Sequence, residues 1–196
     1  MKPYKPDARL FFGLIVAVTI AEIAIADSVF GMASNAMLYK SGAIAAINGL
    51  LWVVFDRFAW KWPLARLTGL SHVPDLNGVW KGELKRSGES ENHGFTLKIN
   101  QTFSTLILST QSNNSSSHSI SAAIVTDELK RNFKIVNHWR SRTLAKGKGY
   151  MDDFVGLSTI AIEEENGEII LTDYYFTNRK PRSTEGVIRL KRGKPK

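Results

Sequence analysis

Two long apolar runs near the N-terminus constrain the fold of this sequence most. The first runs from Leu10 to Ala26, and the second runs from Ser41 to Phe58 and ends among tryptophan and phenylalanine residues. An α-helix rises about 1.5 Å per residue, so about 20 apolar residues cross the hydrocarbon core of a bilayer. The sequence therefore predicts a transmembrane hairpin in residues 1–62, with spans at about 10–30 and 41–58.

A cleaved secretory signal is the alternative for the first apolar run. Lys2, Lys5 and Arg9 form a basic start, and the triplet at 24–26 is similar to a signal-peptidase site. The length of the run and the position of Glu22 inside it favour a membrane span instead. In either case the second run is expected to cross from outside to inside.

The distribution of positive charge predicts the orientation of the hairpin. The segment from Asp27 to Lys40 carries one charge of each sign, whereas both outer ends are positive. The flanking positive residues are Lys2, Lys5, Arg9, Arg57, Lys61 and Arg66. Positively charged segments next to membrane spans stay in the cytoplasm. Both termini, and the rest of the chain, are therefore predicted to be cytoplasmic.

Two polar residues, Glu22 and Asn48, lie inside the predicted spans. Polar groups in hydrocarbon are costly and usually face another helix or water. They can either satisfy one another within a single hairpin or pair between protomers, and the sequence leaves both alternatives open. Small residues of the second span, such as Gly42, Ala46 and Gly49, permit close helix contact.

After a short linker at 63–74, runs of alternating or β-branched residues predict strands in residues 75–196. We expect eight strands, at 78–86, 94–101, 104–111, 118–127, 132–140, 154–164, 168–177 and 184–191. Asn166-Gly167 is the strongest hairpin signal. Eight strands suit a compact sandwich or an up-and-down, lipocalin-like antiparallel barrel. We favour the barrel, which closes its edges and can hold one small ligand.

One face of the predicted strands combines apolar and polar positions. The residues expected to face inward include Trp80, Ile120, Ile124, Asn137, Trp139 and Ser158, with Asp173 and Tyr175 as further candidates. Polar positions inside a barrel are either hydrogen-bonded filling or the lining of a ligand site. The sequence leaves this choice open for each residue.

The loops predicted at one end of the barrel are long, and two of them are basic. Their positive residues are Arg142, Lys146, Lys148, Arg179, Lys180 and Arg182. The linker enters at the other end, so this basic mouth is expected to point away from the membrane. The formal net charge of +8 suits attraction either to anionic lipid or to an anionic ligand such as a nucleotide.

The sequence contains no recognised catalytic or metal-binding pattern. It has no phosphate-binding loop, no H-E-x-x-H, no G-x-S-x-G and no cysteine, and its four histidines are scattered. Its basic residues are also scattered outside any nucleic-acid recognition motif, so neither DNA nor RNA is predicted as a partner. We expect a binding protein rather than an enzyme, with no metal or cofactor.

The segment 75–82 opens the first predicted strand with a Gly78-Val79-Trp80 pattern that is similar to the start of lipocalin-like barrels. Together with the N-terminal hairpin, the short linker and a closing strand at 184–191, it resembles a bacterial family. These are the two-transmembrane β-barrel effectors of cyclic-oligonucleotide antiphage signalling (CBASS), also called CD-NTase-associated effectors. The resemblance covers the whole chain and rests on architecture.

The resemblance implies a function in antiphage defence. In that family a cognate nucleotidyltransferase makes a cyclic dinucleotide and the barrel binds it. The protein then forms a homo-oligomer, and the bacterial inner membrane is disrupted so that the infected cell dies. The alternative is a membrane-tethered, lipocalin-like carrier of a small apolar ligand.

A cyclic dinucleotide presents two phosphates and two bases, so its site should combine cations and aromatic faces. We therefore expect Asn137, Trp139 and Tyr175 on the barrel wall and Arg142 and Arg182 at the mouth to bind it. Neither the bases of the messenger nor the number of assembled subunits follows from the sequence.

Overall fold

A computed structural model describes residues 2–4, 8–30, 36–88, 90–111, 115–127, 132–143, 154–178 and 184–193. The chain divides into two compact units. The barrel unit comprises Met1–Tyr4, Asp75–Gln101 and Thr105–Lys196, and the helical unit comprises Lys5–Pro74 with Thr102–Ser104.

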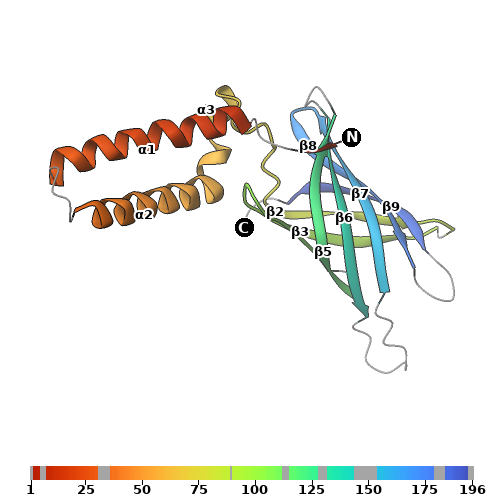
Figure 1. Ribbon diagram of the computed structural model, residues 1–196. Helices are drawn as coiled ribbons and strands as arrows, with labels where there is room; N and C mark the ends of the chain where they lie inside the picture. The colour runs from red at the N-terminus through yellow and green to blue at the C-terminus, as the bar shows by residue number, and fades with distance from the viewer. Residues whose placement is uncertain are drawn as a thin grey trace. The chain divides into compact units, whose positions relative to one another are not determined.

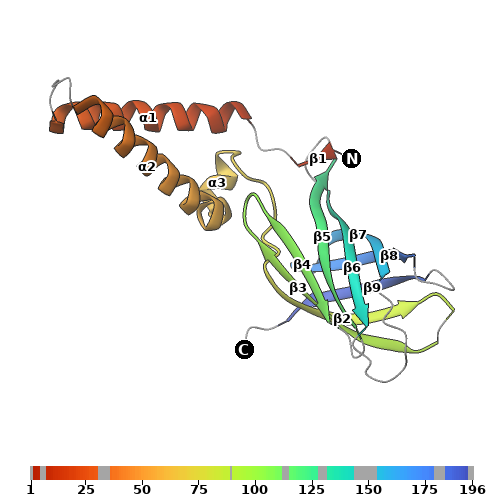
Figure 2. The same cartoon turned by 60° about the horizontal axis from the view of Figure 1, so that its bottom comes forward.

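The barrel unit is one closed antiparallel sheet (Figures 1 and 2). Its strands are β2 (Gly78–Arg86), β3 (Asn92–Gln101), β4 (Leu106–Gln111), β5 (Ser115–Thr126), β6 (Phe133–Thr143), β7 (Phe154–Glu165), β8 (Glu168–Thr177) and β9 (Glu185–Arg192). Each pairs with its neighbours in sequence, and β9 pairs with β2. This arrangement confirms the predicted eight-stranded up-and-down barrel, with strand ends that differ from the prediction by a few residues.

The turn at Asn166-Gly167 is the tightest connection of the barrel that the structure describes. Both residues have positive φ, 53° and 78°, as a two-residue turn between twisted strands requires. Glu165 pairs directly with Glu168 across this turn. Because a two-residue turn sets the register, it aligns all of β7 and β8 and therefore determines which of their side chains face inward.

A further short strand was not predicted. β1 (Lys2–Pro3) pairs with Thr126 and Val125 of β5, and the Tyr4 N–H donates to the Ile124 carbonyl at 2.9 Å. β4 pairs with β5 only at Ser109–Gln111, so part of the β5 edge is available to another strand. A strand of two residues is too short to show an alternation of apolar and polar positions, so the sequence pattern could not predict β1.

A β-bulge in β5 changes which of its residues face inward. The register against β6 shifts between Ser119 and Ser121. Ile120 was expected to face inward but is 51 % exposed, and that prediction is wrong. The extra residue of a bulge reverses the alternation locally, which a period-two pattern cannot anticipate.

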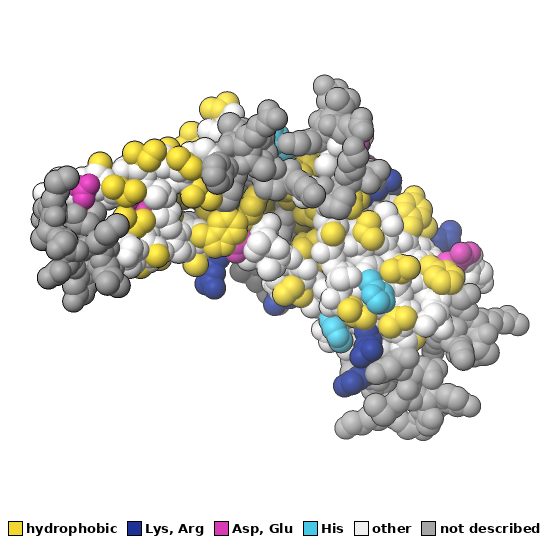
Figure 3. All heavy atoms as spheres, in the orientation of Figure 1, with side chains coloured by type: hydrophobic (Ala, Val, Ile, Leu, Met, Phe, Trp, Pro, Cys, Tyr) yellow, Lys and Arg dark blue, Asp and Glu magenta, His cyan; other side chains and the backbone are white. Residues whose placement is uncertain are grey.

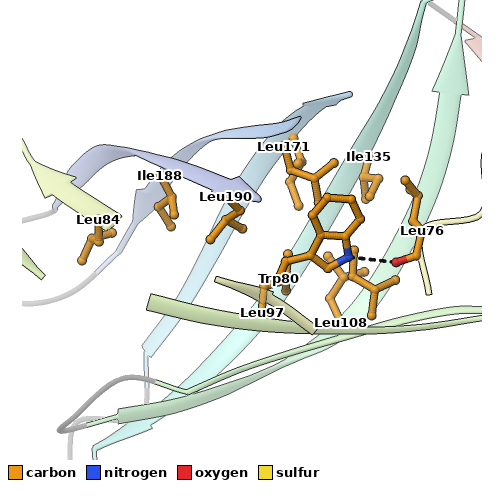
Figure 4. Close-up of a cluster of buried hydrophobic side chains, with 11 residues drawn as sticks. Leu76, Trp80, Leu84, Leu97, Leu108, Ile135, Leu171, Ile188 and Leu190 are labelled. Atoms are coloured by element: carbon orange, nitrogen blue, oxygen red, sulfur yellow. Dashed lines mark hydrogen bonds between the residues drawn. The ribbon is translucent and has the colours of Figure 1, made fainter. Parts of the chain in front are cut away.

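One end of the barrel interior is filled by apolar side chains around Trp80 (Figure 4). Trp80 is completely buried, and its indole N–H donates to the Leu76 carbonyl at 2.9 Å. The guanidinium of Arg192 lies 4.9 Å from the centre of the Trp80 ring. We call this region the closed end; it consists of Leu76, Trp80, Ile99, Ile135, Leu171 and Leu190.

The helical unit contains α1 (Ala8–Phe30), α2 (Ala36–Arg57), the short 3-10 helix η1 (Ala59–Lys61) and α3 (Pro63–Leu67). The segment 63–74, predicted as a linker, therefore begins with a short helix. Two helices form where the hairpin was predicted. Among the helices of the described part of the chain, none combines the length and apolar composition that a membrane crossing needs.

The two polar residues of the predicted spans meet within one chain. The Asn48 amide donates to the Glu22 carboxylate oxygen Oε2 at 2.6 Å and to the Ile44 carbonyl at 3.1 Å. The other carboxylate oxygen of Glu22, Oε1, is buried and has no hydrogen-bond partner among the described residues. The first alternative from the sequence, mutual pairing within one hairpin, is thus the one seen in the monomer.

Candidate functional site: a ligand cavity inside the barrel

The barrel interior opposite the closed end is hollow. The cavity contains about 790 Å³ of space, part of it open to solvent. The side chains that line it come from all eight barrel strands. A ligand in this cavity would therefore be surrounded by the whole sheet.

Aromatic rings form part of the cavity wall. Trp139 and Phe154 meet edge to face, with ring centres 5.9 Å apart and an interplanar angle of 75°. Trp139 lies against Gly156, its register partner, where an added Cβ would come within 2.3 Å of the ring. Each ring thus has a defined position, as a stacking surface for a planar ligand requires.

Tyr175 repeats this arrangement on the neighbouring strands. It pairs with Gly186, where an added Cβ would lie 2.5 Å from the Lys85 carbonyl oxygen and 2.7 Å from the Tyr175 ring. Tyr175 is partly buried and packs against the apolar core. The glycines at 156 and 186 are therefore spacers that let two large rings lie close to the sheet.

Two buried polar residues, Asn137 and Asp173, form the floor of the cavity. They are 5 % and 8 % exposed, and the Oδ1 atom of each has no hydrogen-bond partner among the described residues. Burial raises the pKa of Asp173 from 3.8 to about 7, and a hydrogen bond from Ser158 opposes that shift. The floor therefore presents hydrogen-bond acceptors in a setting of low polarity.

Hydroxyl groups cover much of the remaining wall. Some are used within the barrel: the Ser119 hydroxyl accepts from the Leu108 N–H at 3.0 Å, and Thr177 bonds Thr184 at 2.8 Å. Arg86 and His118 also line the cavity. The lining thus offers aromatic faces, acceptors, hydroxyls and a cation, which suits a polar, planar and anionic ligand.

Of the five residues predicted to bind ligand, three line this one cavity. They are Asn137, Trp139 and Tyr175. Arg142 is exposed and follows Ser141, whose side chain lines the cavity, so the alternation of β6 directs Arg142 outward. Arg182 lies outside the described residues, as do the other cations of the predicted mouth loops at 146, 148, 179 and 180.

Arg86 is the cavity residue that the sequence reasoning missed. It lies on the same face of β2 as Trp80 and Leu84, at even spacing. Extending the inward alternation of that strand by one step would have found it. No group of acidic or histidine side chains in the described ranges could hold a metal ion.

Comparison with known families agrees with this geometry. Residues 71–192, which include all eight barrel strands, match the family model described as "Cap15, cyclic dinucleotide receptor domain". The chain belongs to this family. A curated Cap15 relative, CD-NTase-associated protein 15 of Staphylococcus schleiferi, is 28 % identical over 147 residues, which is 74 % of this chain and 75 % of the relative.

Membership of the Cap15 family supports two expectations from the sequence. The first is that the chain is a CBASS effector, and the second is that its barrel receives a cyclic dinucleotide. The two-transmembrane subtype, the oligomer and the membrane step stay predictions.

Proposed function

We propose that this protein is a CBASS effector whose barrel binds a cyclic dinucleotide in the described cavity and whose helices then disrupt the inner membrane. The observation that carries the proposal is the lining of the cavity. It combines aromatic rings, buried acceptors and Arg86 in a domain whose family is described as a cyclic dinucleotide receptor. The messenger comes from a cognate nucleotidyltransferase, and the protein itself acts by binding rather than by catalysis.

Each part of a cyclic dinucleotide has a counterpart in the cavity. The bases stack on Trp139 and Tyr175, since every base has a π-face and each stack contributes about 1–3 kcal/mol. The phosphates approach Arg86 and the wall hydroxyls, which donate hydrogen bonds to anionic oxygens.

A carrier of an apolar ligand is the second candidate. A fatty chain needs a long apolar cavity, but in this barrel Trp80 and its neighbours already fill the apolar end. What is left open is lined partly by aliphatic residues such as Leu84 and Ile188, but it also carries Asn137, Asp173 and several hydroxyls. Leaving these polar groups against a hydrocarbon chain would cost their desolvation energy without compensation. The lining therefore favours the nucleotide.

The membrane step depends on the helical unit. Ile20, Ile25 and Leu50 are each more than 60 % exposed, and apolar side chains lie along the surface of the helices (Figure 3). These surfaces suit contact with lipid or with other hairpins. We propose that both termini and the barrel are cytoplasmic, because the positive residues flank the outer ends of α1 and α2.

Disruption of a membrane requires several copies, because two helices enclose no lumen. The outer face of the barrel offers a contact surface for a second copy of this chain. Leu157 lies opposite Phe176, Tyr174 lies opposite Val187, and all four are at least 40 % exposed. A patch of this kind is typical of a protein contact site. Ligand-bound barrels that associate here would concentrate their hairpins and add up weak contacts between them.

Glu22 is positioned to contribute to contacts between hairpins. Asn48 satisfies one carboxylate oxygen and leaves Oε1 as an acceptor for a donor of another copy. Such hydrogen bonds contribute about 0.6 to 2 kcal/mol each. We expect Glu22→Leu to retain ligand binding and barrel association but to reduce dye release from liposomes. A Glu22→Leu protein that releases dye as fast as the parent would assign the carboxylate no role.

Calorimetry of the full chain in lipid nanodiscs tests the proposed function directly. The protein is titrated with cyclic dinucleotides that contain guanine, adenine and uracil, and separately with a long-chain fatty acid. We expect saturable heat with at least one cyclic dinucleotide, and Trp139→Ala should weaken it tenfold or more. Heat with the fatty acid alone would favour the carrier and overturn the proposal.

A further inference from the structure

The two unpartnered acceptors of the cavity floor call for a ligand that donates hydrogen bonds. The Oδ1 atoms of Asn137 and Asp173 are buried and lack partners among the described residues. A buried acceptor without a donor costs about 1–3 kcal/mol. Phosphates cannot supply the donors, because their oxygens are acceptors. The donors must come from the ribose hydroxyls or from the edges of the bases.

The two acceptors belong to one continuous polar surface. Asn137 of β6 lies directly opposite Ser158 of β7, and Ser158 hydrogen-bonds the carboxylate of Asp173 on β8. Ser158 thus bonds Asp173, while the Oδ1 atom of Asp173 is buried and has no hydrogen-bond partner among the described residues. We call these three side chains the acceptor floor. Apolar residues surround it, since Asp173 lies opposite Ile160 and Ile188.

The aromatic rings stand next to the acceptor floor along the same strands. Trp139 follows Asn137 by two residues on β6, and Tyr175 follows Asp173 by two residues on β8. Inward residues two apart on a strand are about 7 Å from each other. A base that stacks on one of these rings can therefore direct its edge toward the acceptor floor.

The four common bases differ in the donors on their edges. Guanine carries donors on two adjacent nitrogens, N1–H and the N2 amino group. Adenine and cytosine each carry donors on one amino group, and uracil has only N3–H. Guanine alone places donors side by side on two ring-edge nitrogens, so it fits two separate acceptors better than the single amino group of adenine or cytosine. A site built for a hydrogen bond strongly rejects an analogue that lacks it.

On the basis of the proposed function, we propose that Asp173 and Asn137 of the acceptor floor accept hydrogen bonds from the Watson–Crick edge of one base. These bonds would select a messenger that contains guanine. In its ionised form Asp173 accepts from one guanine nitrogen, and Asn137 accepts from the other. Ser158 is a positioning residue, because it bonds Asp173 and holds the carboxylate in place.

Calorimetry with matched ligands tests this inference on the full chain in nanodiscs. The ligands are cyclic di-GMP, cyclic di-AMP and cyclic di-IMP, which differs from cyclic di-GMP only by lacking the N2 amino groups. We expect the parent to bind cyclic di-GMP at least tenfold more tightly than either of the others. In Asp173→Asn the preference for cyclic di-GMP over cyclic di-IMP should fall to within about threefold, because the amide can present a donor instead.

Two further variants distinguish a loss of base preference from a general loss of ligand binding. Asn137→Ser shortens the second acceptor and should also reduce the preference, while Glu164→Gln removes an exposed acid of β7 and should leave it unchanged. Binding of cyclic di-AMP reports whether each variant still has a working cavity. A variant that retains this binding but loses the guanine preference supports the inference.

The outcomes separate this inference from the proposed function. If no cyclic dinucleotide binds the parent, both are overturned. If cyclic dinucleotides bind with equal affinity whatever their base, the receptor function stands and the reading of guanine is overturned. A guanine preference that survives unchanged in both Asp173→Asn and Asn137→Ser would likewise overturn the assignment of these residues.

Discussion

The two ends of the barrel interior have the same backbone architecture but opposite side-chain content. At the closed end the inward positions carry Trp80, Ile99, Leu171 and Leu190, all at most 2 % exposed. Toward the long loops the same strands carry rings, hydroxyls, an amide and an acid around a cavity. The closed end supplies the apolar burial that stabilises the fold. The open end can therefore hold polar groups that reduce stability but bind a ligand.

The largest expected effect comes from replacing one tryptophan at each end of the barrel interior, Trp80 at the closed end and Trp139 at the open end. Trp80→Ala removes a completely buried side chain and should lower the free energy of unfolding by about 3–5 kcal/mol. Trp139→Ala, the matched control at the open end, should cost about 1 kcal/mol or less but abolish most ligand binding. Chemical denaturation and calorimetry measure the two quantities. Equal losses of stability would contradict the division of the interior into two roles.

The next effect concerns the pH dependence of stability. The pKa of Asp173 is raised from 3.8 to about 7, so between these values the folded chain holds a proton that the unfolded chain has lost. The contribution of Asp173 to the free energy of unfolding therefore decreases as pH rises from about 4 to about 7 and is constant above. Its total is at most a few kcal/mol. Asp173→Asn should remove this decrease, as denaturation at several pH values would show.

Other ionisable groups line the same cavity, so their contribution to the pH dependence of stability must be separated from that of Asp173. Arg86 from β2, His118 from β5 and Tyr175 from β8 also line it. The comparison between parent and Asp173→Asn is therefore repeated in a His118→Gln background, which removes the imidazole from the cavity wall. A pH profile that Asp173→Asn leaves unaltered in both backgrounds would show that the acid is not the source.

A smaller effect is expected from Gly156, one of the two glycine spacers, which lets the Trp139 ring lie close to the sheet. The three atoms nearest to an added Cβ at Gly156 all belong to the Trp139 ring, the nearest at 2.3 Å, so Gly156→Ala should displace the ring. We expect about tenfold weaker ligand binding with little loss of stability. Gly94→Ala in β3 is the control, because nothing lies within 4 Å of its Cβ position. Unchanged affinity in Gly156→Ala would show that the ring position does not matter.

The smallest effect compares two arginines at the open end. Arg86 lines the cavity, whereas Arg142 is exposed on the outer face. Arg86→Ala should weaken binding of a cyclic dinucleotide about tenfold, because a charge-assisted hydrogen bond is lost. Arg142→Ala should change it by no more than about twofold, since the charges of exposed groups are screened. Calorimetry at one salt concentration measures both affinities. A larger loss of affinity in Arg142→Ala than in Arg86→Ala would show that Arg142, and not Arg86, binds the ligand.

Much of the barrel could be predicted from the sequence because its signals are local. Alternation along each strand, the Asn166-Gly167 turn and the Gly78-Val79-Trp80 opening depend on residues near one another in the chain. The same alternation placed Asn137, Trp139 and Tyr175 on the inner face, and all three line the cavity. A period-two pattern assigns a face without knowledge of the partner strands.

Tertiary structure decided the features that depend on distant segments. β1 exists because β4 leaves part of the β5 edge unpaired, and the bulge at Ser119/Ser121 turns Ile120 outward. The convergence of Asn137, Ser158 and Asp173 requires the register of three strands, and the strongly raised pKa of Asp173 follows from its burial. A linear pattern records the face of each residue but not its neighbours, because register and closure are set by packing of the whole sheet.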